Sequence, residues 1–324
     1  MTDPPAFTGA GLDRCGDGRR RRADWLAAQR LDPAAQVVHA GDAGLRLEGE
    51  RLRRTPLAEL RPETASESLL LGIGSEGPLF ALDEDGPPQQ PARPRLIGGG
   101  GRRGEVSPAA AGWIGLREAA GSLSQEEGGL AAYAAALLNW HRSHRFCGVC
   151  GAGTEVCEGG DARLCPRCGT NHHPRTDPVV IMLVTRPGAL MLGRQESWPA
   201  RRYSALAGFV SPGESLEEAV IREVGEEAGV DVGAPRYVSS QPWPFPASLM
   251  IGFVVPWRGG EPGGSDPEIE DVRWFERLAV AEAACRDEEW DGTEATGQIQ
   301  LPPRTAIARR LVERWLRDPG LASA

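Results

Sequence analysis

Residues 208–230 read GFVSPGESLEEAVIREVGEEAGV, and this stretch decides the fold of the second half of the chain. Ser215, followed three residues later by Glu218, is a capping-box pattern, which predicts that a helix begins here. Gly229 is typical of the residue at which a helix ends in the left-handed conformation. We therefore expect a helix over 215–229, with a glycine-containing loop before it that can bring backbone N–H groups close to a phosphate.

The glutamates of this predicted helix gather on one side. At about 100° per residue, Glu223, Glu226 and Glu227 fall within a sector of roughly 100°. That line begins with the apolar Leu216, at the rim of the core, whereas Arg222 is predicted to point the opposite way. A merely charged surface helix would place its glutamates opposite the valines. Crowded carboxylates repel one another unless a cation lies between them, and oxygen ligands of this kind suit Mg²⁺ or Mn²⁺.

The same stretch resembles the Nudix box, G-x5-E-x7-R-E-U-x-E-E-x-G-U, in which U is aliphatic. Every fixed position is matched, by Gly208, Glu214, Arg222, Glu223, Val224, Glu226, Glu227, Gly229 and Val230. The resemblance implies an α/β/α sandwich with a mixed sheet that hydrolyses a diphosphate joined to another moiety. It also implies that the three glutamates of the helix hold several divalent metal ions, and that Glu214 and Arg222 position the loop and the helix.

Four of the seven cysteines form two C-x2-C pairs, Cys147 with Cys150 and Cys165 with Cys168, separated by 14 residues. Two such pairs complete a tetrahedral zinc site of four thiolates, which is closed and therefore structural. We expect one Zn²⁺ per chain, with a histidine of the pair 172–173 replacing one cysteine as the alternative. Paired cysteines of this kind indicate a reducing compartment, so we expect a cytoplasmic protein.

Residues 240–250 read SQPWPFPASLM and form a proline-stiffened stretch with two large aromatic rings. The stretch resembles the SQPWPFPxS signature located after the box in NADH pyrophosphatases. That subfamily also has a four-cysteine zinc ribbon before the Nudix domain and a separate N-terminal domain. The resemblance implies a set of substrate-binding residues, namely Phe209 stacked on a base, Gln241, Trp243, Phe245, Ser248 and Ala308, with His173 at a position where tyrosine is expected. Glu268 matches a further acidic position, as metal ligand or general base.

These features predict metal-dependent hydrolysis of NADH or NAD⁺ to nicotinamide mononucleotide and AMP. Glu226, Glu227 and Glu268 are the candidates for the general base. The alternatives are removal of NAD caps from RNA 5′ ends, hydrolysis of another substrate such as ADP-ribose, and a non-catalytic nucleotide sensor. We expect a homodimer because the subfamily is typically dimeric.

Length and composition set the frame for this prediction. The chain has 324 residues, 40% of them hydrophobic, and a net charge of −9, which disfavours a nucleic-acid coat protein. The N-terminal stretch MTDPPAFTGAGLDRCG has no apolar signal core, and the apolar run at 179–184 is too short to span a bilayer, so we expect no membrane partner. We expect an N-terminal mixed α/β domain over 1–128, a linking helix and zinc ribbon over 129–177, and the Nudix domain over 178–324.

Several further elements are expected from local patterns. The expected strands are 36–40, 69–73, 78–82, 203–208, 247–257 and 271–276, with a hairpin over 178–195. The expected helices are 129–141 and 305–318, and RRRR at 19–22 is interpreted as the solvated start of a helix. The stretches 86–95 and 98–104 carry loop signals.

Overall fold

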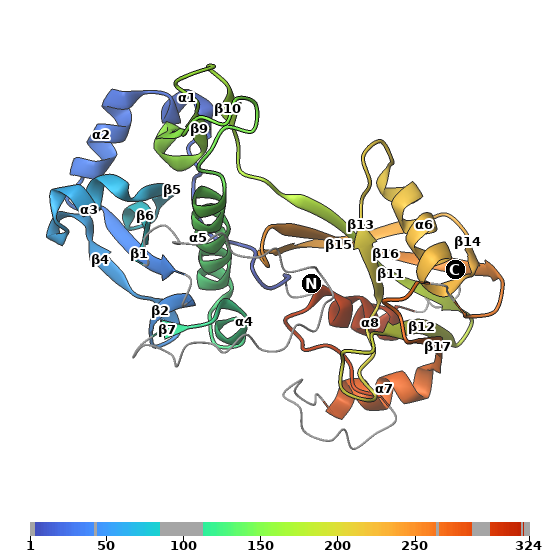
Figure 1. The fold of residues 1–324 in the computed structure, drawn as a ribbon. Coiled ribbons are helices and arrows are strands. Elements are labelled where there is room, and N and C mark those ends of the chain that lie inside the picture. Colours follow the sequence, from blue (N-terminus) through green and yellow to red (C-terminus); the bar gives the residue numbers. More distant parts are fainter. Residues whose placement is uncertain are drawn as a thin grey trace. The chain divides into compact units, whose positions relative to one another are not determined.

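The computed structural model describes residues 4–41, 44–84, 113–263, 266–286, 299–318 and 320. The loops expected at 86–95 and 98–104 lie outside these residues. The chain divides into two compact units, which are considered separately (Figure 1). The first holds the described residues up to 176 together with Trp243–Ala247, and the second holds the remaining described residues from 177 onward. None of the helices in this described part of the chain is long and apolar enough to cross a bilayer.

A mixed sheet organises the first unit. Its strands lie in the order β3 (Arg51–Leu52), β2 (Gly44–Glu48), β1 (Gln36–Gly41), β6 (Gly77–Asp83) and β5 (Leu69–Gly74), while β4 (Arg54–Pro56) pairs with β1 and β7 (Trp113–Ile114) pairs with β2. Only β1 and β6 run parallel among these pairs of described strands. The expected strands at 36–40, 69–73 and 78–82 are confirmed to within one residue at each end.

Helices cover both faces of this sheet, because successive side chains of a strand point to opposite sides. The long helix α5 (Gln125–Ser143) packs on the face that carries Val38 and Leu71. The other face, with Phe80, is covered by α2 (Ala23–Leu31). The unit also contains three shorter helices, α1 (Gly16–Arg20), α3 (Pro62–Glu67) and α4 (Leu116–Ala119), and the 3-10 turn η1 (Leu57–Glu59). Helix α4 packs with α5, whereas α3 and η1 lie on the face of α2.

Helix α5 begins four residues before the expected start at 129. The side chain of Ser124 caps it by accepting a hydrogen bond of 3.3 Å from the backbone N–H of Glu127. The expected domain boundary between 128 and 129 therefore falls inside this helix, and the division of the chain into three parts stays a prediction.

The arginine run at 19–22 was expected to be solvated, and for Arg20 this is wrong. Arg20 is only 1% exposed. Its guanidinium donates hydrogen bonds of 2.9 Å to the carbonyl oxygens of Leu70 and Leu71 and forms an ion pair of 3.0 Å with Asp161. A local charge pattern could not show this, because the partners lie 50 or more residues away along the chain.

A small three-stranded sheet comes after α5 and carries the cysteine knuckles. Its strands are β8 (Glu155–Cys157), β9 (Ala162–Leu164) and β10 (Asn171–His172), in the order β10-β9-β8. The 3-10 turn η2 (Glu158–Gly160) joins β8 to β9. Asp161, the ion-pair partner of Arg20, lies directly after this turn, so the ribbon is tied to the N-terminal helices of the same unit.

The second unit is built on a curled mixed sheet. Its strands lie in the order β14 (Asp231–Val232), β16 (Ser248–Gly259), β11 (Asp177–Arg186), β12 (Ala189–Arg194) and β17 (Asp271–Glu276), while β13 (Leu206–Phe209) pairs with β11 and β15 (Arg236–Trp243) pairs with β16. Strands β11 and β16 run parallel over nine residue pairs. The hairpin expected at 178–195 is confirmed as β11 and β12, and Gly188 adopts a positive φ of 78° in its turn.

Two helices sandwich this sheet. On β16, Ile251 and Phe253 belong to the core beneath α6 (Leu216–Ala228). Gly252 points the other way, where an added Cβ would lie 3.1 Å from side-chain atoms of Ile307 and Leu311 in α8 (Ile307–Arg317). A third helix, α7 (Arg277–Arg286), comes after β17. The predicted α/β/α arrangement is therefore confirmed.

The element boundaries in this unit differ from expectation at one strand. The strand expected at 203–208 begins at Leu206, because Tyr203 instead turns its hydroxyl to Asp271, to which it donates a hydrogen bond of 2.5 Å. The strand at 271–276 has the predicted bounds. The strand expected at 247–257 and the helix expected at 305–318 are each displaced by at most two residues at either end.

Replacement of Arg20 by alanine should strongly destabilise the first unit. The change leaves two buried carbonyl groups without hydrogen-bond donors and Asp161 without its cation. Breaking a buried ion pair costs about 3 kcal/mol or more. Arg21→Ala is the matched control, since Arg21 forms exposed ion pairs with Asp17 and Glu158 that contribute at most about 1 kcal/mol. Chemical denaturation followed by tryptophan fluorescence measures both. Equal losses for the two variants would contradict the structural role of Arg20.

Candidate functional site

The ends of α6 are fixed by the interactions that its sequence predicts. The side chain of Ser215 accepts a hydrogen bond from the backbone N–H of Glu218 (3.2 Å), and the carboxylate of Glu218 accepts one from the N–H of Ser215 (2.7 Å). Gly229 ends the helix at a φ of 69°. These caps and the buried face that includes Val220 and Val224 set the rotation of the helix about its axis, and that rotation decides where its glutamates lie.

The three glutamates of α6 lie in two environments. Glu223 and Glu227 are each only 8% exposed, whereas 54% of the Glu226 side chain is exposed. The helix thus presents two buried carboxyl groups beside a third that water can reach. The two buried carboxyl groups need a cation or hydrogen-bond donors beside them, because an isolated charge away from water is costly.

Arg222 was expected to point away from the glutamates, and its guanidinium does not. Nη1 donates hydrogen bonds to Glu223 Oε1 (2.8 Å) and to Glu226 Oε2 (3.0 Å). The Cα of Arg222 lies on the predicted side of the helix, but its long side chain bends back toward the acidic face. Arg222 therefore supplies the cation that crowded carboxylates require, for two of the three glutamates.

Arg222 also holds the loop that precedes α6. Its Nε and Nη2 donate to the two oxygens of Glu214, at 3.0 and 2.6 Å, and Nη2 donates to the carbonyl oxygen of Phe209 at 2.9 Å. The hydrogen bonds from Arg222 and from the backbone N–H of Ser211 lower the pKa of Glu214 to about 2. One guanidinium thus ties together the end of β13, the loop and the helix.

The close packing around Gly208 explains why the first position of the box is a glycine. Gly208 pairs with Val180 in the sheet, and the carboxylate of Glu223 lies directly on its backbone. A Cβ at Gly208 would lie 1.9 Å from Glu223 Cδ and 2.0 Å from its Oε1. Any larger residue would therefore have to displace the carboxylate of Glu223.

Glu227 lies among other carboxylates. Its Oε2 accepts a hydrogen bond of 3.2 Å from the backbone N–H of Ala207. Burial, and then repulsion from Glu223, Asp266 and Glu268, raises the pKa of Glu227 to about 8. Glu268 is exposed in the turn before β17, where its backbone N–H donates to Asp266 Oδ1 at 2.7 Å. Asp266 was not singled out from the sequence, although the acidic run SDPEIED signals it.

The chemistry of the donor set suits a hard divalent cation, although among the described residues the ligand atoms that converge are those of the four cysteines. The carboxyl groups of Glu223, Glu226 and Glu227, with Glu268 close enough to repel Glu227, offer only oxygen ligands. Their mutual repulsion raises the free energy of the ionised cluster, and a cation among them lowers it. Oxygen-only sites of this type suit Mg²⁺ or Mn²⁺ better than softer metals.

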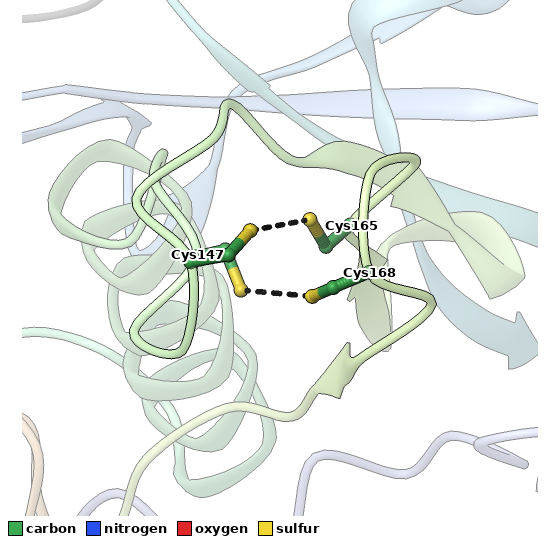
Figure 2. A group of neighbouring side chains, drawn as sticks. Cys147, Cys165 and Cys168 are labelled. Atoms are coloured by element: carbon green, nitrogen blue, oxygen red, sulfur yellow. Dashed lines mark hydrogen bonds between the residues drawn. The ribbon is translucent and has the colours of Figure 1, made fainter.

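The four cysteines of the ribbon converge in the first unit (Figure 2). The Sγ atoms of Cys147 and Cys168 are 3.6 Å apart, those of Cys150 and Cys165 are 3.5 Å apart, and all four lie within 4.8 Å of one another. A tetrahedral zinc site with Zn–S bonds of ~2.3 Å has sulfur atoms about 3.8 Å apart. The cluster is therefore consistent with structural zinc, and His172 adds a hydrogen bond of 3.3 Å to the Sγ of Cys147.

Three of the expected substrate-binding residues lie in the interior of the second unit. Gln241 is fully buried, where its Nε2 donates to the carbonyl oxygen of Thr305 and its Oε1 accepts from the N–H of Ile307, both at 2.7 Å. It thereby satisfies the first turn of α8, which also carries the buried Ala308. Ser248 opens β16, and its buried Oγ has no hydrogen-bond partner among the described residues.

The two aromatic residues of the proline-rich stretch belong to the first unit. Trp243 and Phe245 each make an edge contact with Phe7, with ring centroids 6.1 and 6.0 Å apart. The guanidinium of Arg117 lies 4.2 Å from the ring centre of Phe245 and 5.1 Å from that of Trp243. These partners could not be found from the sequence, because no local pattern links positions 7, 117 and 245.

Of the remaining residues, Phe209 ends β13 with its ring exposed, and His173 is exposed directly after β10. The structure brings six of the expected residues into one network, namely Phe209, Glu214, Arg222, Glu223, Glu226 and Glu227.

Replacement of Gly208 by alanine should weaken divalent-metal binding by roughly tenfold or more, since loss of a residue that orients a metal ligand typically costs 10–100-fold in metal affinity. The reason is the steric conflict with the carboxylate of Glu223. Gly225→Ala on α6 is the matched control, because an added Cβ there meets no atom within 4 Å. Titration with Mn²⁺, followed by electron paramagnetic resonance, measures both. Unchanged affinity in Gly208→Ala would show that Glu223 does not contribute to the site.

Cys165→Ser should lower zinc content and thermal stability together, since a structural site contributes directly to folding. Cys285→Ser, at an exposed cysteine outside the cluster, should change neither. Metal analysis and thermal melting measure the two effects. A Cys165→Ser protein that keeps its zinc and its melting temperature would argue against the four-thiolate site.

Comparisons with known proteins agree with this geometry. The NUDIX domain family matches residues 175–293, the NADH pyrophosphatase zinc ribbon domain matches 142–172, and the NADH pyrophosphatase-like rudimentary NUDIX domain matches 23–140. The N-terminal region is thus itself related to a NUDIX domain, which its weak sequence pattern did not reveal.

Similar proteins are found in bacteria and primates. The chain is 43% identical over 204 residues to the NAD-capped RNA hydrolase NudC of Stutzerimonas stutzeri, covering 63% of this chain and 67% of that protein. It is 39% identical over 211 residues to NudC of Deinococcus radiodurans, covering 64% and 69%. The match to the human NAD-capped RNA hydrolase NUDT12 is 42% over 210 residues and spans 61% of this chain but only 44% of that protein. The family resemblance of the sequence is confirmed, and the chain belongs to the NADH pyrophosphatase family of Nudix hydrolases.

Proposed function

We propose that this chain hydrolyses the pyrophosphate of NADH or NAD⁺ to nicotinamide mononucleotide and AMP. The observation that carries the proposal is the carboxylate cluster of α6, in which Glu223 and Glu227 are buried beside one another and Glu226 is exposed. Such a cluster suits hydrolysis of a polyanion through divalent ions. The family places this chemistry on a dinucleotide.

In this proposal, Glu223, Glu226, Glu227 and Glu268 hold several Mg²⁺ or Mn²⁺ ions, and the four cysteines hold one Zn²⁺. When bound, the divalent ions neutralise phosphate charge and acidify the attacking water. The chain's own residues then have separate tasks. Arg222 and Glu214 keep the loop and α6 in register, and the exposed ring of Phe209 offers a surface on which a base can stack.

The reaction consumes one water and breaks one bridging P–O bond. The water oxygen attacks one phosphorus, the bridging oxygen leaves with the other phosphate, and a carboxylate takes the proton released by the water. Among Glu226, Glu227 and Glu268, we favour Glu226 as that base. Its side chain is 54% exposed, and Arg222 donates a hydrogen bond to its Oε2.

Substrate specificity is proposed to depend on the proline-rich stretch. Gln241 is a positioning residue in this scheme, because it acts through the first turn of α8 and Ala308. The buried hydroxyl of Ser248 is free among the described residues to bond a substrate group. Trp243, Phe245 and His173 are kept as candidates for contact with the dinucleotide.

A second candidate function is the same chemistry on NAD-capped RNA, which the names of the similar proteins favour. The two substrates share the pyrophosphate and differ in whether an RNA chain is attached to the adenosine. We further propose a homodimer, because the subfamily is typically dimeric. We also propose a cytoplasmic location, because paired thiolates persist in reducing compartments. Sedimentation analysis tests the first of these.

Product analysis on NADH, NAD⁺, ADP-ribose and NAD-capped RNA, each with Mg²⁺ or Mn²⁺, tests the proposed function. NADH or NAD⁺ should give nicotinamide mononucleotide and AMP, and Phe245→Ala should lose more kcat/KM on them than on ADP-ribose. Glu226→Gln should reduce turnover by ~10²-fold or more, which corresponds to about 2.7 kcal/mol of barrier. Glu217→Gln, at an exposed position of the same helix, is the control and should remain active. Cleavage of ADP-ribose alone would overturn the assignment.

A further inference from the structure

A pocket of about 200 Å³ opens in the first unit, and none of its lining residues belongs to the acidic cluster of α6. Its walls come from the sheet, from α5 and from the zinc ribbon. The apolar part consists of Leu69 on β5, Leu82 on β6, Leu138 on α5 and Val156 on β8. The polar part is dominated by three arginines at positions 142, 145 and 163.

Arg163 is the unusual member, because it is a buried cation without an acidic partner among the described residues. It is only 8% exposed. Its Nε donates to Thr154 Oγ1 (2.7 Å), its Nη2 to the carbonyl oxygen of Thr154 (2.8 Å) and its Nη1 to His141 Nδ1 (2.9 Å). All three acceptors are neutral. His141 donates from Nε2 to the carbonyl oxygen of Gly160 (2.7 Å), so its Nδ1 carries the lone pair that Arg163 uses.

The neighbouring charges leave this cation uncompensated. Arg145 lies close enough to Arg163 for the two positive charges to repel each other. The nearby thiol of Cys157 is neutral at pH 7, because burial raises its pKa. Arg142 is already paired with Asp83, at 2.5 and 3.0 Å. In the part of the chain that the structure describes, Arg145 has no acidic partner.

We infer that this pocket binds a small phosphomonoester, with its phosphate between Arg145 and Arg163 and its sugar or other carbon skeleton against the leucines. A buried guanidinium is stabilised by an anion that can accept several hydrogen bonds at once, and phosphate oxygens do so in the planar geometry that arginine offers. An anion between these two arginines also removes their mutual repulsion. The apolar wall and the modest volume favour a phosphorylated small molecule over bare phosphate.

The remaining acid at the pocket, Glu67 at the end of α3, opposes an anion. It is exposed, so its repulsion is weakened by water and salt. Replacement of Glu67 therefore provides a second test, in which the expected effect on binding is opposite to that of replacing an arginine. Removal of its charge should leave binding equal or tighter, whereas loss of an arginine should weaken it.

Isothermal titration calorimetry with ribose 5-phosphate and with inorganic phosphate tests the site, on the full chain and without added Mg²⁺ or Mn²⁺. Ribose 5-phosphate should bind more tightly than phosphate. Arg145→Gln should weaken its binding by about tenfold or more, as expected for the loss of a charge-assisted contact. Arg167→Gln, at an exposed arginine of the ribbon that does not line the pocket, should bind like the parent. Glu67→Gln should bind equally or more tightly.

Arg145 is exposed, so its replacement leaves the fold intact, which thermal melting checks. No detectable heat with ribose 5-phosphate, or the same affinity in Arg145→Gln as in the parent, would overturn the inference. Hydrolysis of NADH by Arg145→Gln at the parent rate is expected, because the pocket shares no residue with the carboxylates of α6.

Discussion

The guanidinium of Arg222 holds the candidate active site together. It contacts the carbonyl oxygen at the end of β13, both oxygens of Glu214 in the loop, and one oxygen each of Glu223 and Glu226. Arginine keeps its charge at any ordinary pH and presents a rigid fork of donors, so it offsets the charges of the acids that it contacts. Glu227, which Arg222 does not contact, is the acid whose pKa is raised to about 8.

Close packing of the acids depends equally on the absence of a side chain at Gly208. The carboxylate of Glu223 rests on the backbone of that residue, and Glu227 receives a backbone N–H from the adjacent Ala207. Strand β13 therefore does more than continue the sheet, since two of its residues form the floor of the acidic cluster. The exposed Glu226 lies above this floor, where water can reach it. A buried pair and an exposed third acid thus arise from one helix, through its rotation alone.

Local patterns predicted the parts of the structure that local interactions decide. The caps of α6, the turn at Gly188 and the four-cysteine cluster each depend on residues close in sequence or on a fixed spacing. The contacts that the sequence did not predict share a cause. Arg20 is buried by carbonyl groups of a distant strand, Gln241 is engaged by the first turn of α8, and the curl of the Arg222 side chain depends on Glu214. Long, flexible or amphipathic side chains choose among partners that the fold supplies, and a sequence pattern does not contain that choice.

The placement of Trp243 and Phe245 has a consequence for the order in which the chain is made. Their rings pack against Phe7 and beneath Arg117, in the core that also contains α5. Synthesis proceeds from the N-terminus. More than 120 residues after Arg117, including β11 to β15, must therefore be synthesised before these two rings are available to the first unit. Until then Phe7 lacks the rings that cover it. Completion of the first unit is therefore coupled during translation to the growth of the second, and neither is a self-contained segment of the chain.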